Sequence, residues 1–255
     1  MIKKEYRWLT DIYVAHRGLF NNVDVPENSV PAFIKASESG FGIETDVQMT
    51  KDGVLVVFHD DTLDRMTNGH GKLCDHTFSE LRELKLGATN LQIPTFAEFL
   101  QAANGANLIV EIKTHENIGE TEQKIYDQLK GYKGNFCIES FNPFIVRWFK
   151  VNAPEVIRGQ LSFSYKGMPM AWFKRSLLSK LRFCKWNGSQ FIAYDANTIN
   201  CKYVRKWAKK VPIICWTITS QPQLDKLQPY FDNIIFDSFT PERRDLQKLE
   251  GEHNG

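Results

Sequence analysis

Ionisable side chains stand at the ends of four short apolar runs in the first half of this 255-residue chain. Runs of this length that are rich in Val, Ile and Leu predict β-strands. The four pairs are His16 and Arg17, Glu44 and Asp46, His59 and Asp60, and Glu111 and Lys113. Strands with only a structural role do not require charged residues at four successive strand ends. We therefore interpret the four pairs as parts of one site.

Two of these pairs share a spacing that fixes their geometry. Residues i and i+2 of a strand point to the same face, so Glu44 lies beside Asp46, and Glu111 beside Lys113. Three carboxylates at one end of a sheet repel one another and partly protonate unless a cation lies between them. All-oxygen ligands select a hard ion, Mg²⁺ or Ca²⁺, over zinc. The spacing therefore predicts a divalent-metal site.

The remaining charged residues fit the chemistry of a phosphate group. Arg17 and Lys113 would hold an anion opposite the metal. His16 and His59 are candidate proton donors and acceptors near neutral pH. Together the residues indicate metal-assisted phosphoryl transfer. The simpler alternatives are that the acids cap helices or pair with Arg, and that the two cations only neutralise carboxylates.

The elements that must position these residues alternate along the chain between strand and helix. The predicted strands are Ile12–Ala15, Gly42–Val47, Leu108–Ile112, Phe136–Glu139, Ile157–Leu161, Phe191–Tyr194, Val211–Trp216 and Asn233–Phe236. Eight strands alternating with helices predict an α/β fold that closes into a (β/α)₈ TIM barrel, with its chemistry at the C-terminal strand ends. A doubly wound open sheet is the alternative, because periodicity does not show whether a sheet closes.

One segment interrupts this alternation. We predict a single barrel domain over residues 1–255, with a small insertion after the second strand at about 49–103. The insertion holds an extra β-run at Val54–Phe58 and would lie on the catalytic rim. Within it, we expect neighbouring Asp64 and Arg65 to form a structural pair.

Composition narrows the class of protein. The chain is 42% hydrophobic and 24% charged, which is typical of a globular protein with one sizeable core. A formal net charge of +2 gives no support for a nucleic-acid partner. Five widely spaced cysteines without a Cys-x-x-Cys pair argue against a disulfide framework and a zinc site. With no apolar run of about 20 residues and no apolar stretch after the first basic residues, a cytoplasmic location is expected.

A basic segment from Tyr165 to Trp186 has a second possible use. It carries six Lys or Arg residues and no acidic residue, interleaved with Met and aromatic side chains. A basic amphipathic helix of this kind can lie weakly on an anionic membrane surface. The alternative is a barrel helix, predicted over Pro169–Arg182, whose apolar face packs on the sheet while its lysines are solvated.

Several motifs occur in a characteristic order. They are His16-Arg17-Gly18, Pro26-Glu27-Asn28-Ser29, Glu44-Thr45-Asp46-Val47, Val56-Val57-Phe58-His59-Asp60, Ile93-Pro94-Thr95, Glu111-Ile112-Lys113, Ser140-Phe141 and Trp216-Thr217. In this order and spacing the chain resembles the glycerophosphodiester phosphodiesterase family, whose members are phospholipase-C-like phosphodiesterase barrels. The resemblance spans nearly the whole chain and is dense up to Lys113.

The resemblance implies a role for each matching residue. The implied roles are metal ligation by Glu44, Asp46 and Glu111, acid–base catalysis by His16 and His59, and phosphate contact by Arg17 and Lys113. Trp216 is either a wall against which substrate stacks or plain rim packing. The chain departs from the family near its last strand, where Asp237 is present but the following proline is displaced to Pro241.

The resemblance also implies a reaction. The expected substrates are glycerophosphodiesters, the deacylated phospholipids, and the expected products are glycerol 3-phosphate and an alcohol. The neighbouring glycerol hydroxyl would attack phosphorus, and water would then open a cyclic phosphate. Two alternatives stay open, namely a lysophospholipase D-like enzyme acting on lysophospholipids and an inactive barrel that only binds phosphodiesters.

Overall fold

Eight parallel strands close into a barrel in the computed structural model, which describes residues 6–113 and 118–242. The strands are β1 (Val14–His16), β2 (Gly42–Met49), β4 (Leu108–Ile112), β5 (Phe136–Ser140), β6 (Ile157–Ser162), β7 (Phe191–Asp195), β8 (Ile213–Ile218) and β9 (Asn233–Phe236). Because β1 pairs with both β2 and β9, the sheet has no open edge at this point. The predicted (β/α)₈ barrel is confirmed, and the open-sheet alternative is wrong.

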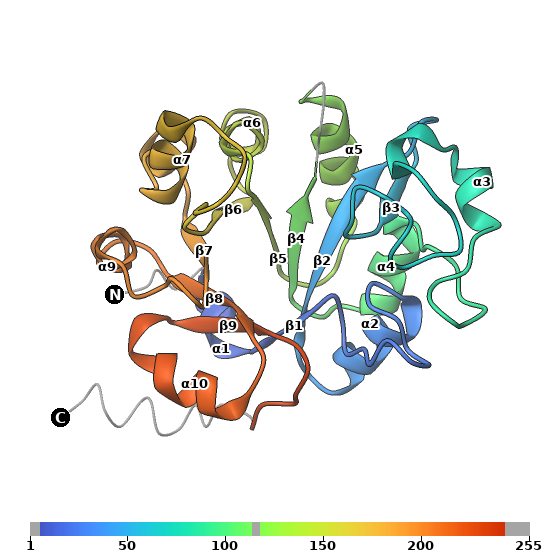
Figure 1. The fold of residues 1–255 in the computed structure, drawn as a ribbon, viewed down its shortest axis with the longest axis horizontal. Coiled ribbons are helices and arrows are strands. Elements are labelled where there is room, and N and C mark those ends of the chain that lie inside the picture. Colours follow the sequence, from blue (N-terminus) through green and yellow to red (C-terminus); the bar gives the residue numbers. More distant parts are fainter. Residues whose placement is uncertain (1–5, 114–117, 243–255) are drawn as a thin grey trace.

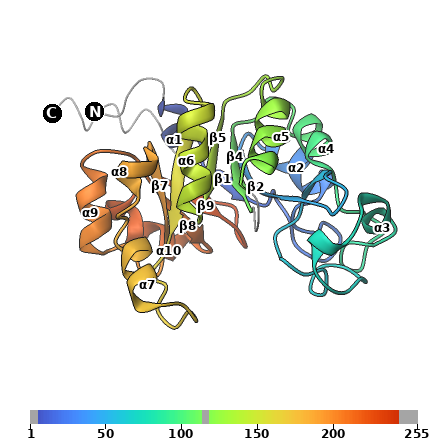
Figure 2. The same ribbon diagram turned by 90° about the horizontal axis from the view of Figure 1, so that it is seen from above.

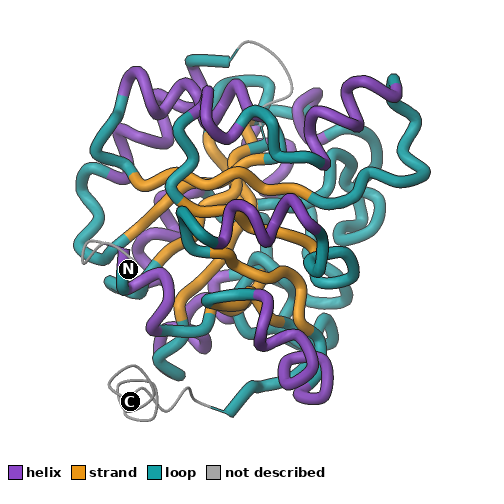
Figure 3. The backbone as a smooth tube through the Cα atoms, turned by 90° about the vertical axis from the view of Figure 1, so that its left-hand side faces the viewer, coloured by secondary structure: helices purple, strands orange, loops and turns teal. Residues whose placement is uncertain are grey.

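Helices surround the strands on the outside of the barrel (Figure 1), and the tube view shows the strands gathered in the middle (Figure 3). They are α1 (Trp8–Asp11), α2 (Val30–Glu38), α3 (Phe78–Arg82), α4 (Phe96–Ala103), α5 (Glu120–Leu129), α6 (Pro143–Asn152), α7 (Trp172–Ser179), α8 (Cys184–Asn187), α9 (Lys202–Ala208) and α10 (Gln221–Leu227). No helix in the described part of the chain has both the length and the apolar character needed to cross a membrane.

Strand β4 shows why these apolar runs become barrel strands. Leu108, Val110 and Ile112 pack in the core between sheet and helices, whereas Ile109 packs inside the barrel. A strand buried on both faces reads as a continuous apolar run, which is the pattern of a parallel sheet covered by helices. Because side chains alternate between the faces, Glu111 follows Ile109 on the inner face at the C-terminal end of the barrel.

The segment between β2 and β4 adds a strand and a small core of its own. Strand β3 (Leu55–Val57) pairs antiparallel with β2. A separate apolar cluster, which includes Phe58, Leu63 and Leu81, holds the loops around α3 together. Helix α4 ends the segment and packs beside α2 in the outer layer (Figure 1). This small core can hold residues such as His59 in place over the barrel mouth.

Residues of complementary size on β6 and β7 fill the inside of the barrel. Gly159 and Phe191 are register partners on these neighbouring strands. The ring of Phe191 is fully buried and occupies the space that a side chain at Gly159 would need. Large and small residues on facing positions thus fill the barrel interior as a packed core.

We expect Gly159→Ala to lower the melting temperature, because its Cβ would lie 2.2 Å from the Phe191 ring. Overpacking of a core costs about 1–3 kcal/mol, and each kcal/mol lowers the melting temperature of a domain of this size by about 2–4 °C. Differential scanning calorimetry would measure the change. Gly131→Ala is the control, since its Cβ would meet nothing closer than the Gln128 carbonyl at 3.7 Å. Equal melting of both variants would contradict this account of the interior.

Candidate active site

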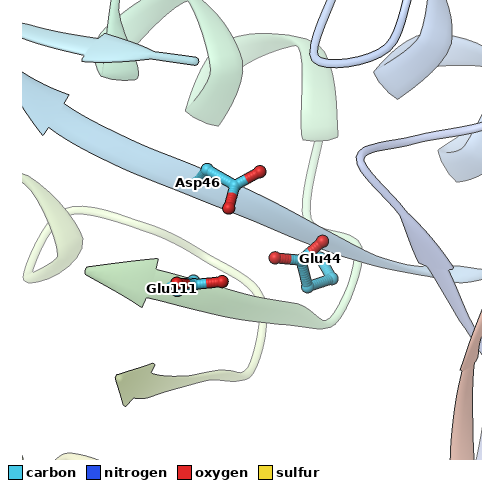
Figure 4. Close-up of side chains that lie close together, drawn as sticks. All are labelled: Glu44, Asp46 and Glu111. Carbon is cyan, nitrogen blue, oxygen red and sulfur yellow. The ribbon is translucent and has the colours of Figure 1, made fainter. Parts of the chain in front are cut away.

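Three carboxylates converge at the C-terminal end of the barrel. Asp46 on β2 and Glu111 on β4 are register partners, and Glu44 lies two residues before Asp46 on the same face. One carboxylate oxygen from each of the three lies within 4.8 Å of the other two. Figure 4 shows the side chains of these two neighbouring strands directed toward one another. The three residues predicted as metal ligands are therefore brought together.

The clustering strongly perturbs the acidity of these groups. Burial, together with the charges of Asp46 and Glu111, raises the pKa of Glu44 well above its usual value. Burial also raises the pKa of Glu111 to about 7, although Lys113 acts in the opposite direction. Burial alone would raise the pKa of Asp46 as well, but Lys113 and Arg17 beside it bring that pKa below its usual value. The site thus holds more negative charge than its cations balance.

A fourth carboxylate, Glu139 on β5, extends the same row. It is the register partner of Glu111, is almost fully buried, and its Oε2 has no hydrogen-bond partner among the described residues. Burial and the neighbouring carboxylates of Glu111 and Asp46 raise its pKa well above the usual value. Sequence reasoning placed Glu139 at a strand end but gave it no role. The sequence does carry a signal for Glu139, because the predicted strand Phe136–Glu139 also ends in an acidic residue.

Lys113 and Arg17 lie against this acidic row. The Lys113 ammonium is 3.2 Å from Asp46 Oδ1 and 3.1 Å from Glu111 Oε1. The Arg17 guanidinium lies 3.4 Å from Asp46 Oδ2 through Nε and 2.7 Å from Glu27 Oε1 through Nη1. The ion pairs raise the pKa of both cations despite their burial, so both stay charged. Their pairing with carboxylates matches the simpler alternative, and a role in phosphate binding stays a prediction.

The turn after β1 gives Arg17 its position. Arg17 has φ 55° and Gly18 has φ 84°, both in the left-handed region. At Gly18 a Cβ would lie 2.8 Å from the backbone of Ala32, so the turn can approach α2 this closely only with glycine. The turn directs the Arg17 backbone N–H to Glu44 Oε2, at 3.1 Å. It thereby anchors one of the three converging carboxylates.

A chain of ion pairs links the insertion to the barrel. Glu27 accepts hydrogen bonds from both Arg17 and Arg65, and Arg65 also binds both oxygens of Asp60. Asp64 instead lies 2.9 Å from the exposed His70. The predicted pairing of Asp64 with Arg65 is therefore wrong. Neighbours in an irregular loop need not share a face, and Arg65 turns inward to buried Glu27.

Each of the two predicted catalytic histidines is held by a carboxylate. His16 Nδ1 lies 2.9 Å from Asp237 Oδ2, and His59 Nδ1 lies 2.6 Å from Asp60 Oδ1. A carboxylate at Nδ1 fixes the ring and keeps the proton on that nitrogen, so Nε2 is the nitrogen available for proton transfer. Burial lowers the pKa of both imidazoles and outweighs the neighbouring carboxylates. The neutral, proton-accepting form is therefore favoured near neutral pH.

These groups share one pocket with a volume of about 200 Å³. Its lining is His16, Arg17, Glu44, His59, Glu111, Glu139, Phe141, Leu161, Trp216, Thr217 and Ile235. One wall is aromatic, because Trp216 packs edge-to-face on Phe141 with ring centroids 5.6 Å apart. Trp216 therefore both lines the pocket and packs on the rim, and its contact with substrate stays a prediction.

The acidic residues have the chemistry of a divalent-metal site. Three buried carboxylates converge there and offer the all-oxygen ligands that hard cations prefer. The raised pKa values of Glu44 and Glu111 are the response expected when such carboxylates gather with too little positive charge between them. Glu44, Asp46 and Glu111 thus fit a divalent cation.

A (β/α)₈ barrel with buried carboxylates and two carboxylate-held histidines at its C-terminal mouth has the layout of a barrel hydrolase active site. The model of the "Glycerophosphoryl diester phosphodiesterase family" matches residues 16–229. Glycerophosphodiester phosphodiesterase 1 of Bos taurus is 29% identical over an alignment of 238 residues, and the match covers 81% of this chain and 71% of that protein. A glycerophosphodiester phosphodiesterase of Caldanaerobacter subterraneus is 38% identical over an alignment of 162 residues, and the match covers 59% of this chain and 66% of that protein.

A solved structure has the same fold. A phosphodiesterase from Oleispira antarctica, in complex with the product sn-glycerol-3-phosphate, superposes with a TM-score of 0.77 at 24% identity. The match covers 98% of this chain and 99% of that one. The chain belongs to the glycerophosphoryl diester phosphodiesterase family and is accordingly a phosphoric diester hydrolase.

Removing divalent metal should lower the melting temperature, because a cation bound only to the folded state stabilises it. At a hundredfold excess over the dissociation constant the gain is about 2.7 kcal/mol, which corresponds to roughly 5–10 °C. Calorimetry with EDTA, Mg²⁺ or Ca²⁺ would measure this. Asp46→Asn should abolish the shift, whereas Glu155→Asn, an exposed change, should keep it. A shift of the same size in Asp46→Asn would contradict the assigned ligands.

Proposed function

We propose that this chain hydrolyses glycerophosphodiesters to glycerol 3-phosphate and a free alcohol, with His16 and His59 as its acid–base pair. One observation carries the proposal, which is that a single pocket is lined by both imidazoles and by carboxylates that could hold a metal. The names of the related proteins support the substrate class. The volume of about 200 Å³ suits a small polar group such as a glycerol phosphate.

The first step breaks the bond between phosphorus and the leaving alcohol. A glycerol hydroxyl beside the phosphate attacks phosphorus, and one imidazole accepts its proton at Nε2. The other imidazole, in its protonated form, donates a proton to the oxygen of the departing alcohol. In the second step water attacks the cyclic phosphate and the two histidines exchange roles, which yields glycerol 3-phosphate. Asp237 and Asp60 keep each ring oriented through both steps.

The charged groups around the histidines act on the phosphate. A divalent cation, Mg²⁺ or Ca²⁺, held by Glu44, Asp46 and Glu111 would supply positive charge to the phosphate oxygens. Arg17 and Lys113, which stay protonated, lie on the same carboxylates and would contact the anion beside them. The aromatic wall that includes Trp216 would shield the reacting groups from water.

A second candidate is a lysophospholipase D-like hydrolase acting on lysophospholipids with the same residues. The specific observation in its favour is the exposed apolar surface of α7, where Trp172 and Phe173 face solvent beyond β6. An acyl chain would need an apolar surface near the pocket. Rates on a water-soluble diester and on a lysophospholipid therefore separate the two candidates.

The assay for the proposed reaction measures glycerol 3-phosphate from the two deacylated diesters and lysophosphatidic acid from the lysolipid, which keeps its acyl chain when the same bond breaks. Glycerophosphocholine, glycerophosphoethanolamine and a lysophosphatidylcholine would each be incubated with the enzyme in EDTA, Mg²⁺ or Ca²⁺. We expect metal-dependent glycerol 3-phosphate from the first two. Faster conversion of the lysolipid would favour the second candidate. No product from any diester, in protein shown by calorimetry to be folded, would contradict both.

His16→Ala and His59→Ala should each lower kcat for glycerophosphocholine by about 10²–10⁴-fold, the usual scale for losing a general acid or base. The fold should survive, since both side chains line a pocket and are not part of the apolar core. His70→Ala, an exposed histidine in the insertion, is the matched control and should keep normal kcat. Near-normal turnover in both pocket variants would overturn the acid–base assignment.

Asp237→Asn should lower kcat by roughly 10–100-fold, the scale seen when a residue that orients a functional histidine is lost. The amide has nearly the same size, so the melting temperature should change little. Because Asp237 acts through His16, its effect should largely disappear in the His16→Ala background. Additive losses in the double variant would show that Asp237 acts elsewhere. Asp225→Asn, on exposed α10, is the control.

A further inference from the structure

Helix α7, between β6 and β7, contacts the barrel only through its second half and leaves its first turn exposed. None of its residues is buried, and Trp172 at its start is 76% exposed. The place between β6 and β7 is taken instead by α8, which buries Cys184 and Asn187 and contacts α6. Leu181, in the predicted Pro169–Arg182 helix, packs in the main core, whereas α7 itself buries no residue on the sheet. Its large apolar side chains are left in contact with water.

The exposed residues of α7 and of the loop before it form a patch whose charged members are all basic. We call it the α7 patch, and it consists of Lys166, Met168, Trp172, Phe173 and Lys174. Residues 165–186 carry six basic and no acidic residues, so the remaining chain has a formal charge of +2 − 6 = −4. None of these six cations forms an ion pair with a residue that the structure describes. The charges of the patch are thus unpaired within the described residues, and its Trp172 and Phe173 rings contact each other but stay exposed.

The patch lies on the side of the barrel where the pocket opens. Helix α7 follows the C-terminal end of β6, and its last turn lies over the strand ends, where Ser162 Oγ donates to the Leu178 carbonyl at 3.1 Å. Figure 2 shows α7 and α3 projecting from the same side of the barrel. A row of ring contacts runs from Trp216 in the pocket through Phe141 and Phe163 to Tyr165, the residue directly before the patch. The aromatic wall of the pocket therefore continues toward the α7 patch.

From these observations we propose that the α7 patch docks this enzyme on an anionic membrane surface, with the pocket mouth turned toward the lipid. Trp and Phe side chains enter the boundary between head groups and acyl chains, while the surrounding lysines meet acidic head groups. A second copy of the chain does not suit the α7 patch as a partner, because a symmetric contact would bring two basic patches together. The docking does not depend on which diester the pocket cleaves.

Vesicle sedimentation tests this directly on the intact chain. We expect binding to vesicles of phosphatidylglycerol and phosphatidylcholine in equal parts at low salt, weaker binding at high salt, and little binding to phosphatidylcholine alone. Trp172→Ala/Phe173→Ala should lower the partition coefficient about tenfold or more. Lys166→Gln/Lys174→Gln should lower it about tenfold, because each cation near an anionic surface contributes to binding.

The controls lie at the opposite end of the barrel. Lys133 and Lys209 are exposed and precede β5 and β8, and Val151, at the end of α6, is 61% exposed. Lys133→Gln/Lys209→Gln and Val151→Ala should bind vesicles as the wild type does. Hydrolysis of glycerophosphocholine in solution should be unchanged in all four variants, so a failure of docking is distinct from a failure of the proposed reaction.

Two results would overturn the proposal. The first is equal vesicle binding by the wild type and both α7 variants, or equal loss in the patch and control variants. The second is a lipid-free dimer in sedimentation velocity that Trp172→Ala/Phe173→Ala dissociates, since this would assign the patch to self-association. A monomer that binds only anionic vesicles, through the patch residues alone, would establish the docking surface.

Discussion

Repulsion between like charges is the constraint around which the mouth of this barrel is built. Four carboxylates are buried there on the three neighbouring strands β2, β4 and β5: Glu44, Asp46, Glu111 and Glu139. Lys113 and Arg17 are the cations that lie against them. Fully ionised, the six groups carry 2 − 4 = −2, the charge that one divalent cation would balance. Burial, together with repulsion between these charges, raises the pKa values of three of the four carboxylates, Glu44, Glu111 and Glu139.

The insertion belongs to this charge balance as much as the strands do. It supplies His59, and its own small apolar core holds the loop that carries this residue. Arg65 reaches from the insertion to Glu27, and Glu27 in turn binds Arg17, which lies against the carboxylates of β2. Along this series, from Arg65 through Glu27 and Arg17 to Asp46, each charge lies beside one of opposite sign, as a buried ionic network requires. The position of His59 is therefore coupled to that of the barrel residues.

The sequence predicted the barrel and the converging carboxylates because both follow from local patterns. Strand ends and the spacing of Glu44 and Asp46 are visible in a single run of residues, and eight such runs alternating with helices favour a closed barrel over an open sheet. Long-range pairing is not visible in this way. The register that sets Glu139 beside Glu111, and the contact of His16 with Asp237 across 221 residues, depend on how the sheet closes. The predicted pairing of Asp64 with Arg65 was wrong for the same reason, because the direction in which a loop side chain points depends on tertiary contacts.

The α7 segment shows a further limit of pattern reasoning. An amphipathic pattern reports that a helix has an apolar face, but it does not report what covers that face. Between β6 and β7 the barrel offers room for one packed helix, and α8 fills it with Cys184 and Asn187 buried. The apolar residues of α7 then either contact another apolar phase or stay in water, where exposed aromatic side chains contribute nothing to the free energy of folding. The row of ring contacts from Trp216 to Tyr165 runs from the pocket wall to the residue that precedes the α7 patch, so the exposed aromatic groups of α7 and the aromatic wall of the pocket lie on the same side of the barrel.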